Sequence, residues 1–185
     1  MRAVPTALPG VLIVEPVVYR DPRGFLLETY HADKYRAAGI AAPFVQDNHS
    51  RSAARTLRGL HAQVGAHPQG KLVRALQGEI FDVAVDVRRG SPSFGRWVGV
   101  RLSSEDFRQL WLPPGFLHGF CVLGETAEVA YKCTETWDAA SEISVCWNDP
   151  AIGIDWPIHD PILSAKDAAA PVLADVMDRL PRYSP

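Results

Sequence analysis

The stretch Thr56–Asp86, TLRGLHAQVGAHPQGKLVRALQGEIFDVAVD, decides the fold of this chain. Apolar and polar residues alternate along its first two arms, and its last arm is rich in valine and isoleucine, which is typical of β-strands. We interpret residues 71–87 as a β-hairpin that turns at Gln77 and Gly78. The stretch therefore predicts β-strands with one polar face turned toward a cavity.

The same stretch contains a histidine and two cations that are candidates for chemistry. If its strands are antiparallel and joined by a loop, the side chains of Arg58, His61 and Lys71 converge from neighbouring strands. A base beside two cations favours an anionic substrate with an acidic C–H bond. Taken alone, a histidine in a strand is more often a hydrogen-bonded core residue than a catalyst.

Short strands separated by turn residues continue on both sides of this stretch, and no sustained helical period appears. The expected strands lie within residues 10–19, 25–30, 44–50, 95–103, 108–113, 117–124, 127–137 and 142–149. Short helical segments are expected at 31–40 and around 172–180, with a helical turn after Ser103. This pattern predicts an all-β sandwich or barrel, closed most naturally as a jelly roll. No linker or repeat divides the chain, so residues 1–185 are expected to form a single domain.

Composition excludes several classes of protein. The 185 residues are 47% hydrophobic with a formal net charge of -2, which gives no basic footprint for nucleic acid. No apolar run is long enough to cross a membrane, and the N-terminal residues lack a signal pattern, so we expect a cytoplasmic protein. The three cysteines lack the spacing of a metal or redox motif and are expected to be buried free thiols: Cys121, Cys133 and Cys146.

Histidine is the side chain whose ordinary pKa, ~6.5, allows it to act as base or acid at neutral pH. Four of the six histidines lie in polar or turn-like segments and are expected to be exposed or structural: His31, His49, His67 and His159. The other two, His61 and His118, lie inside apolar strands.

A metal site is not expected. The segment PPGFLH, which ends at His118, has the P-x-G-x-x-H spacing of metal-binding jelly rolls of the cupin type. In those proteins this histidine joins an H-x-H pair, but here Ala62 and Gln63 follow His61, so too few ligands remain. The surviving pattern is better explained by the fold.

Tyr131 and Asp167 have two interpretations each. Tyr131 alternates with Val129 and Cys133 on one face of its strand, where a core tyrosine bonded to backbone is the simple alternative to a catalytic acid. Asp167 in LSAKD is placed to cap or begin a helix.

Nine segments together resemble one known family. In chain order they are RGFLLE, QDNHS, RGLH, QGKLVR, GEIFDVAVDVRRGSPSFGRWVGV, LWLPPGFLHGF, AEVAYK, DPAIGIDWP and LSAKD. Their sequence and order resemble those of the dTDP-4-dehydrorhamnose 3,5-epimerases of deoxysugar biosynthesis, from about Pro9 to Pro171. The resemblance implies a cupin-type double-stranded β-helix, or jelly roll, with short peripheral helices, assembled as a homodimer.

The resemblance also implies residue roles. By matching motif, His61 is the general base, Asp167 its partner, Lys71 the stabiliser of the enolate and Tyr131 the opposing acid. The implied contacts to the nucleotide sugar are Arg23, Glu28, Gln46, Asn48, Arg58, His118, Glu142 and Lys166.

The implied reaction inverts C3 and C5 of dTDP-4-dehydro-6-deoxy-D-glucose to give dTDP-4-dehydro-L-rhamnose. Both hydrogens are α to the C4 ketone, so a base, a cation for the enolate and an acid on the opposite face are enough. No cofactor is expected, and no dinucleotide motif is present. Two alternatives stay open: a relative that inverts only C3 or only C5, and a non-catalytic jelly roll that binds a sugar nucleotide.

Two positions depart from the family pattern. Ala62 follows RGLH where many relatives have an aromatic residue, and Thr136 stands where an aromatic residue is expected to stack on thymine. The adjacent Trp137 is a candidate to replace that contact. The preference for the nucleotide base is therefore left open by the sequence.

Overall fold

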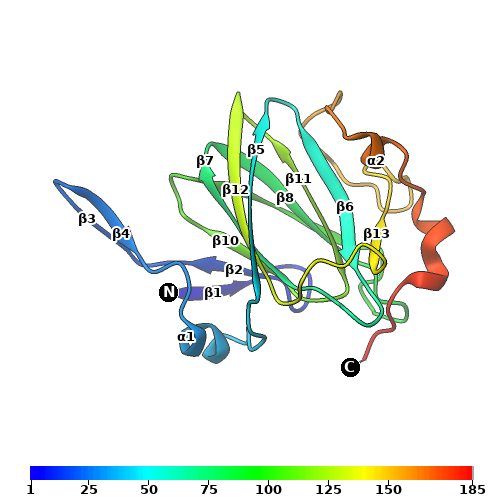
Figure 1. Ribbon diagram of the computed structural model, residues 1–185, viewed down its shortest axis with the longest axis horizontal. Helices are drawn as coiled ribbons and strands as arrows, with labels where there is room; N and C mark the ends of the chain where they lie inside the picture. The colour runs from blue at the N-terminus through cyan, green and yellow to red at the C-terminus, as the bar shows by residue number, and fades with distance from the viewer. Residues whose placement is uncertain (185) are drawn as a thin grey trace.

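The computed structural model describes residues 1–184 as a sandwich of two antiparallel β-sheets (Figure 1). The six-stranded sheet runs β1 (Arg2–Pro5), β2 (Leu12–Glu15), β10 (Gln109–Leu112), β7 (Lys71–Gln77), β12 (Thr126–Cys133) and β5 (Gln46–Ala53). The five-stranded sheet runs β13 (Glu142–Ser144), β6 (Leu57–Gln63), β11 (Phe116–Val122), β8 (Glu79–Asp86) and β9 (Trp97–Ser103). Because the chain crosses repeatedly between the two sheets, the predicted all-β jelly roll is confirmed.

The predicted hairpin at Gln77 and Gly78 is wrong. β7 and β8 are consecutive in sequence, but β7 pairs with β10 and β12, whereas β8 pairs with β9 and β11 in the other sheet. Gly78 has a φ of +71°, and a Cβ there would lie 2.2 Å from the carbonyl oxygen of Thr126, so only glycine fits this corner. A run of alternating apolar residues cannot distinguish a hairpin from a turn that changes sheets.

The same topology changes how the candidate residues meet. His61 on β6 and Lys71 on β7 belong to facing sheets, not to neighbouring strands of one sheet. The prediction that they converge is confirmed, but they do so across the interior of the sandwich.

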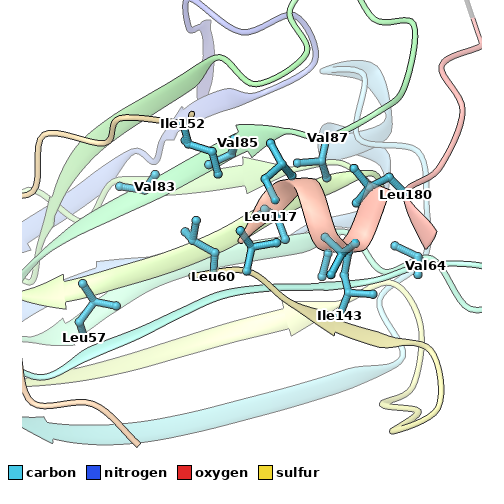
Figure 2. Close-up of a cluster of buried hydrophobic side chains, with 14 of the residues drawn as sticks. Leu57, Leu60, Val64, Val83, Val85, Val87, Leu117, Ile143, Ile152 and Leu180 are labelled. Carbon is cyan, nitrogen blue, oxygen red and sulfur yellow. The ribbon is translucent and has the colours of Figure 1, made fainter. Parts of the chain in front are cut away.

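Three apolar clusters hold the layers together. Between the sheets, Val73 and Leu110 of one sheet pack with Ile80 and Phe120 of the other. On the far side of the five-stranded sheet, a second cluster joins β6, β8 and β11 to the C-terminal segment (Figure 2). This segment includes the short helix α2 (Ala165–Ala168) and the 3₁₀ helix η1 (Leu173–Arg179). Each large side chain buried in this way contributes ~1.5–3 kcal/mol, so the C-terminal segment is firmly attached beside the sheet.

The third cluster lies outside the six-stranded sheet, under helix α1 (Ala32–Ala37). Tyr35 and Ile40 pack there against Leu72 and Trp111. The helix expected within 31–40 is confirmed, and Gly39 follows it with a φ of +90°. After Ser103 the capped helical turn that was expected is confirmed, because the Phe107 amide donates to the Ser103 carbonyl at 3.2 Å and the Ser103 hydroxyl accepts from the Glu105 amide at 3.0 Å.

Strands β3 (Val18–Asp21) and β4 (Gly24–Leu27) form a two-stranded hairpin that projects from the body of the sandwich (Figure 1). Its apolar side chains are uncovered: Tyr19, Phe25 and Leu26 are exposed, Leu26 to 72%. Within residues 1–184, no helix has the length and apolar character needed to cross a bilayer.

Candidate active site

Two adjoining cavities, of about 440 Å³ and about 300 Å³, lie between the sheets and are both lined by His61, Lys71 and Tyr131. The larger cavity is also lined by predicted site residues Arg58, His118, Lys166 and Asp167. The smaller one is also lined by Gln46, Asn48 and Glu142. The sandwich thus brings ten of the twelve predicted site residues to one cleft.

His61 is hydrogen-bonded to Asp167. Its Nε2 lies 2.5 Å from the Asp167 carboxylate, which is only 4% exposed. Burial raises the pKa of Asp167, but the hydrogen bond and charge of His61 outweigh burial and lower it. An ionised carboxylate can only accept hydrogen bonds, so Nε2 donates and Nδ1 keeps its lone pair. His61 is therefore arranged as a base with a carboxylate behind it.

The C-terminal segment brings Asp167 to β6 from more than one hundred residues away. The Leu57 amide donates to the Ile162 carbonyl at 3.0 Å, and the Ile162 amide donates to the Arg55 carbonyl at 2.9 Å. Helix α2 then begins with Ser164 as its cap, whose hydroxyl accepts from the Asp167 amide. The predicted helical position of Asp167 and its pairing with His61 are therefore compatible.

Close packing of two glycines allows His61 and His118 to stand opposite each other on β6 and β11. A Cβ at Gly59 would lie 2.6 Å from the Cα of Gly119, so β6 tolerates no side chain there, and a Cβ at Gly119 would lie 3.0 Å from the Arg58 carbonyl oxygen, which is a tight contact. This contact holds the histidine-bearing strands at close range beside the cleft.

Lys71 reaches the cleft from the facing sheet. Desolvation lowers the pKa of its ammonium group below the ordinary value, and the nearby Cys133, Glu142 and Asp82 oppose this shift only in part. A cation held in a site poor in water acts strongly on negative charge that develops nearby.

Tyr131 lies on β12, in the same sheet as Lys71 and opposite His61. Burial and the neighbouring Cys133 raise the pKa of Tyr131, while Arg58 opposes the shift, so the phenol keeps its proton at neutral pH. The hydroxyl finds no hydrogen-bond partner within residues 1–184, in contrast to that of Tyr35, which donates to the Thr29 carbonyl. Its proton is thus free for a ligand.

The remaining predicted residues give the cleft a set of donors and acceptors. Glu142 and Lys166 form an ion pair of 2.6 Å, and Arg58 donates to the Ser52 hydroxyl at 3.1 Å. Gln46 donates to Asn48 at 3.1 Å. Although the whole chain carries a net charge of -2, the larger cavity is lined by three cations, Arg58, Lys71 and Lys166, against the one carboxylate of Asp167, so it suits an anionic ligand.

Arg23 and Glu28 are the two predicted contacts that the fold does not bring to this cleft. Arg23 lies in the turn of the projecting hairpin and pairs with Asp21, and Glu28 follows the hairpin and pairs with Lys34. Neither lines a cavity shared with His61. The fold therefore places both residues outside the cleft of their own chain, and their contact with the ligand stays a prediction.

Trp137 lines the smaller cavity and is 61% exposed, whereas Thr136 does not line it. The Trp137 amide donates to the Gln46 side chain at 2.8 Å. Gln69 holds the same loop by donating to the Glu135 carbonyl at 2.7 Å, and no motif in the sequence pointed to that role. An exposed aromatic face therefore stands at the mouth of the cleft.

Comparison with known proteins shows the family of this chain. Residues 5–175 match the family model described as dTDP-4-dehydrorhamnose 3,5-epimerase. A curated enzyme of that name from Salmonella typhimurium is 56% identical over 175 residues, covering 94% of this chain and 96% of that protein.

Solved structures give the same result. The dTDP-6-deoxy-D-glucose-3,5-epimerase of Legionella pneumophila, in complex with dTDP-4-keto-L-rhamnose, is 50% identical, with a TM-score of 0.96 over 100% of this chain and 99% of that one. A 3'-monoepimerase of Streptomyces bikiniensis, in complex with dTDP-quinovose, is 35% identical, with a TM-score of 0.91 over 97% of this chain and 92% of that one. The chain belongs to the dTDP-4-dehydrorhamnose 3,5-epimerase family.

Proposed function

We propose that this protein is a cofactor-independent epimerase that inverts C3 and C5 of dTDP-4-dehydro-6-deoxy-D-glucose to give dTDP-4-dehydro-L-rhamnose. The observation that carries the proposal is the placement of His61 and Tyr131 on facing sheets of one cleft, with Lys71 lining the same space. A base and an acid on opposite walls are what inversion at carbon requires, because the proton must leave one face and return to the other.

The first step breaks a C–H bond α to the ketone. Nδ1 of His61 takes the proton, and the electron pair of that bond moves into the ring to form an enolate with its charge on O4. Asp167 stabilises the imidazolium through Nε2, and the Lys71 ammonium donates to the oxygen that gains charge.

The second step forms the new C–H bond. Tyr131 delivers its proton to the same carbon from the opposite face, the enolate returns to the ketone, and a phenolate is left. Exchange of protons with water restores Tyr131 and neutral His61. The raised pKa of Tyr131 supports this role, since a phenol that keeps its proton is available as an acid.

The nucleotide part of the substrate is proposed to lie along the cationic side of the cleft. Arg58 and Lys166 balance the diphosphate, while the polar groups around them bind the sugar: Gln46, Asn48, His118 and Glu142. Trp137 offers its exposed face to the thymine ring. The product bound to the Legionella relative supports a ligand of this class.

We also propose that the enzyme is a homodimer in which each hairpin β3–β4 enters the partner's cleft. Arg23 and Glu28 are implied substrate contacts, yet they lie outside the cleft of their own chain, next to uncovered apolar residues such as Leu26. A second copy would bury those side chains and bring both charged residues to a site. In this proposal residues 1–185 form one epimerase domain that acts in the cytoplasm, and the three free thiols support a reducing compartment.

A mixing experiment tests the exchange of hairpins. His61→Asn and Arg23→Ala are purified separately, unfolded, mixed and refolded, and turnover is measured at low substrate. In a dimer with exchanged hairpins, random mixing restores about a quarter of all sites to wild type, because one site of each heterodimer has both defects and the other has none. Activity no higher than that of the two variants refolded alone would reject the exchange.

The reaction itself is tested in deuterated water. The enzyme is incubated with dTDP-4-dehydro-6-deoxy-D-glucose, and the label at C3 and C5 is followed by NMR. Label at both carbons, with the L-rhamno product, supports the proposal. Label at one carbon supports the second candidate, a monoepimerase like the Streptomyces relative. Label at neither carbon would reject both.

A further inference from the structure

A second carboxylate, Asp82, is buried beside the cleft. It lies on β8 with 0% of its surface exposed, between Ile80 and Ala84 on the inward face of that strand and opposite Phe120 on β11. An isolated carboxylate in an apolar core is costly unless other groups compensate for it.

The hydrogen bonding of Asp82 is incomplete. Its Oδ1 accepts from Nε2 of His118 at 2.7 Å, but its Oδ2 is buried without a hydrogen-bond partner among residues 1–184. Asp86, four residues further along β8 and equally buried, accepts from Arg88, Ser91 and Ser93. The hydrogen-bonding capacity of Asp86 is thus filled, as expected for a carboxylate with a structural role, whereas that of Asp82 is not.

The His118–Asp82 pair repeats the arrangement of His61 and Asp167. The two histidines are cross-strand partners, and each donates through Nε2 to a carboxylate. His118 is only 7% exposed and that surface lines the larger cavity, so its Nδ1 is the ring nitrogen left for a ligand.

Asp82 also acts on Lys71 from the opposite sheet. Desolvation lowers the pKa of Lys71, and Asp82 is one of three groups that raise it. The titratable and charged groups that face Lys71 are Cys133 and Tyr131 on β12, Asp82 on β8, Glu142 on β13, Lys166 and Asp167 on α2, Arg58 and His61 on β6, and His118 on β11.

We propose that Asp82 is a positioning residue of the active site, which orients the His118 imidazole toward the sugar and supplies the fixed negative charge that faces the Lys71 ammonium. Asp82 itself does not touch the substrate. Through Nε2 it fixes the tautomer of His118, so that Nδ1 accepts a hydrogen bond from a sugar hydroxyl next to the reacting ketone. The inference rests on the proposed epimerase function.

The test compares Asp82→Asn with Asp86→Asn, a matched loss of charge on the same strand. Asp82→Asn should lower kcat at least tenfold with a smaller change in KM. It should also move the alkaline limb of the kcat profile to lower pH, because Lys71 loses its proton more easily without the nearby charge. Asp86→Asn should lower Tm and leave that limb in place.

A double-mutant cycle tests the route through His118. Asp82→Asn should lower kcat less in a His118→Gln background than in wild type, because the group it positions is already absent. An equal loss in both backgrounds, or a folded Asp82→Asn enzyme with wild-type kcat and an unmoved alkaline limb, would overturn the proposal.

One measurement needs no stable variant of Asp82. Imidazole ¹⁵N spectra of the wild-type enzyme, with the His118 signals identified by their loss in His118→Gln, should show hydrogen on Nε2. A ring with hydrogen on Nδ1 alone would overturn the proposal even if Asp82→Asn does not fold. Exchange at C3 and C5 by the wild-type enzyme is scored separately, so failure of the epimerase function is distinguished from failure of this inference.

Discussion

Replacing Asp167 with asparagine is the most direct test of the histidine–carboxylate pair. The amide has the shape of the carboxylate, and its oxygen can still accept from Nε2 of His61, so the ring orientation is retained and only the charge is lost. The free energy at stake is the attraction between the carboxylate and the imidazolium that forms when His61 takes the proton.

The magnitude follows from the geometry. Nε2 and Oδ1 are 2.5 Å apart, which places the centres of charge about 4 Å apart. At an effective dielectric constant of about 20, two such charges attract by about 4 kcal/mol, or roughly a factor of 10³ in rate. Because His61 is partly exposed to the cleft, screening reduces this, and we expect kcat to fall by roughly 10²–10³.

The assay is loss of the C3 and C5 hydrogens to deuterated water, followed by NMR under saturating substrate. Ser164→Ala is the matched control, since it removes the cap of the same helix and leaves the carboxylate in place. Asp167→Asn should slow exchange at both carbons alike. Exchange within tenfold of wild type, or an equal loss in Ser164→Ala, would refute the argument that the carboxylate charge supports the base.

Three further outcomes are expected. Tyr131→Phe should spare exchange more than inversion, measured as label retained in recovered substrate against product formed; an equal loss of both contradicts its role as acid. Trp137→Ala should raise KM with little change in kcat, whereas Thr136→Ala should change neither. Burial raises the pKa of Asp86, but hydrogen bonds from Arg88 and two serines outweigh burial and lower it to about 2, so the ionised carboxylate stabilises the fold by about 2 kcal/mol above about pH 4 and this stabilisation is lost as the pH falls through about 2. In urea unfolding, the free energy of unfolding of Asp86→Asn should therefore lie below that of wild type at neutral pH and approach it near pH 2; a gap that does not change with pH contradicts the assignment.

The individual strands could be predicted from the sequence because each depends on local alternation and on turn residues. The motifs around His61 and Lys71 also indicated a polar cavity before any strand order was known. The pairing of strands could not be predicted in the same way. At Gly78 the residues on either side read as a hairpin, but the partners of β7 and β8 are set by contacts with strands far away in sequence.

For the same reason, the position of Asp82 beside His118 and Lys71 could not be predicted from the sequence. In EIFDVAVD, Asp82 and Asp86 stand four residues apart and both look like polar interruptions of an apolar strand, so the local pattern does not separate one from the other. Only the fold reveals that one is surrounded by donors and the other faces His118 and Lys71. Arg23 and Glu28 lie outside the cleft of their own chain, and we propose that they complete a site in another copy of the chain.

The division of the site between two sheets follows from the reaction as much as from the fold. Inversion requires a base and an acid that approach one carbon from opposite sides, and adjacent residues on one strand or neighbouring strands of one sheet cannot surround a sugar in that way. A jelly roll supplies two inward faces, with β6 and β11 carrying His61 and His118 on one and β7 and β12 carrying Lys71 and Tyr131 on the other. The turn at Gly78, where a hairpin was predicted, carries the chain from β7 in one sheet to β8 in the other and is one of the crossings that place these residues on two facing sheets. A side chain at Gly78 would clash with the Thr126 carbonyl and so change the distance between the two sheets, although it would not contact any residue of the cleft directly.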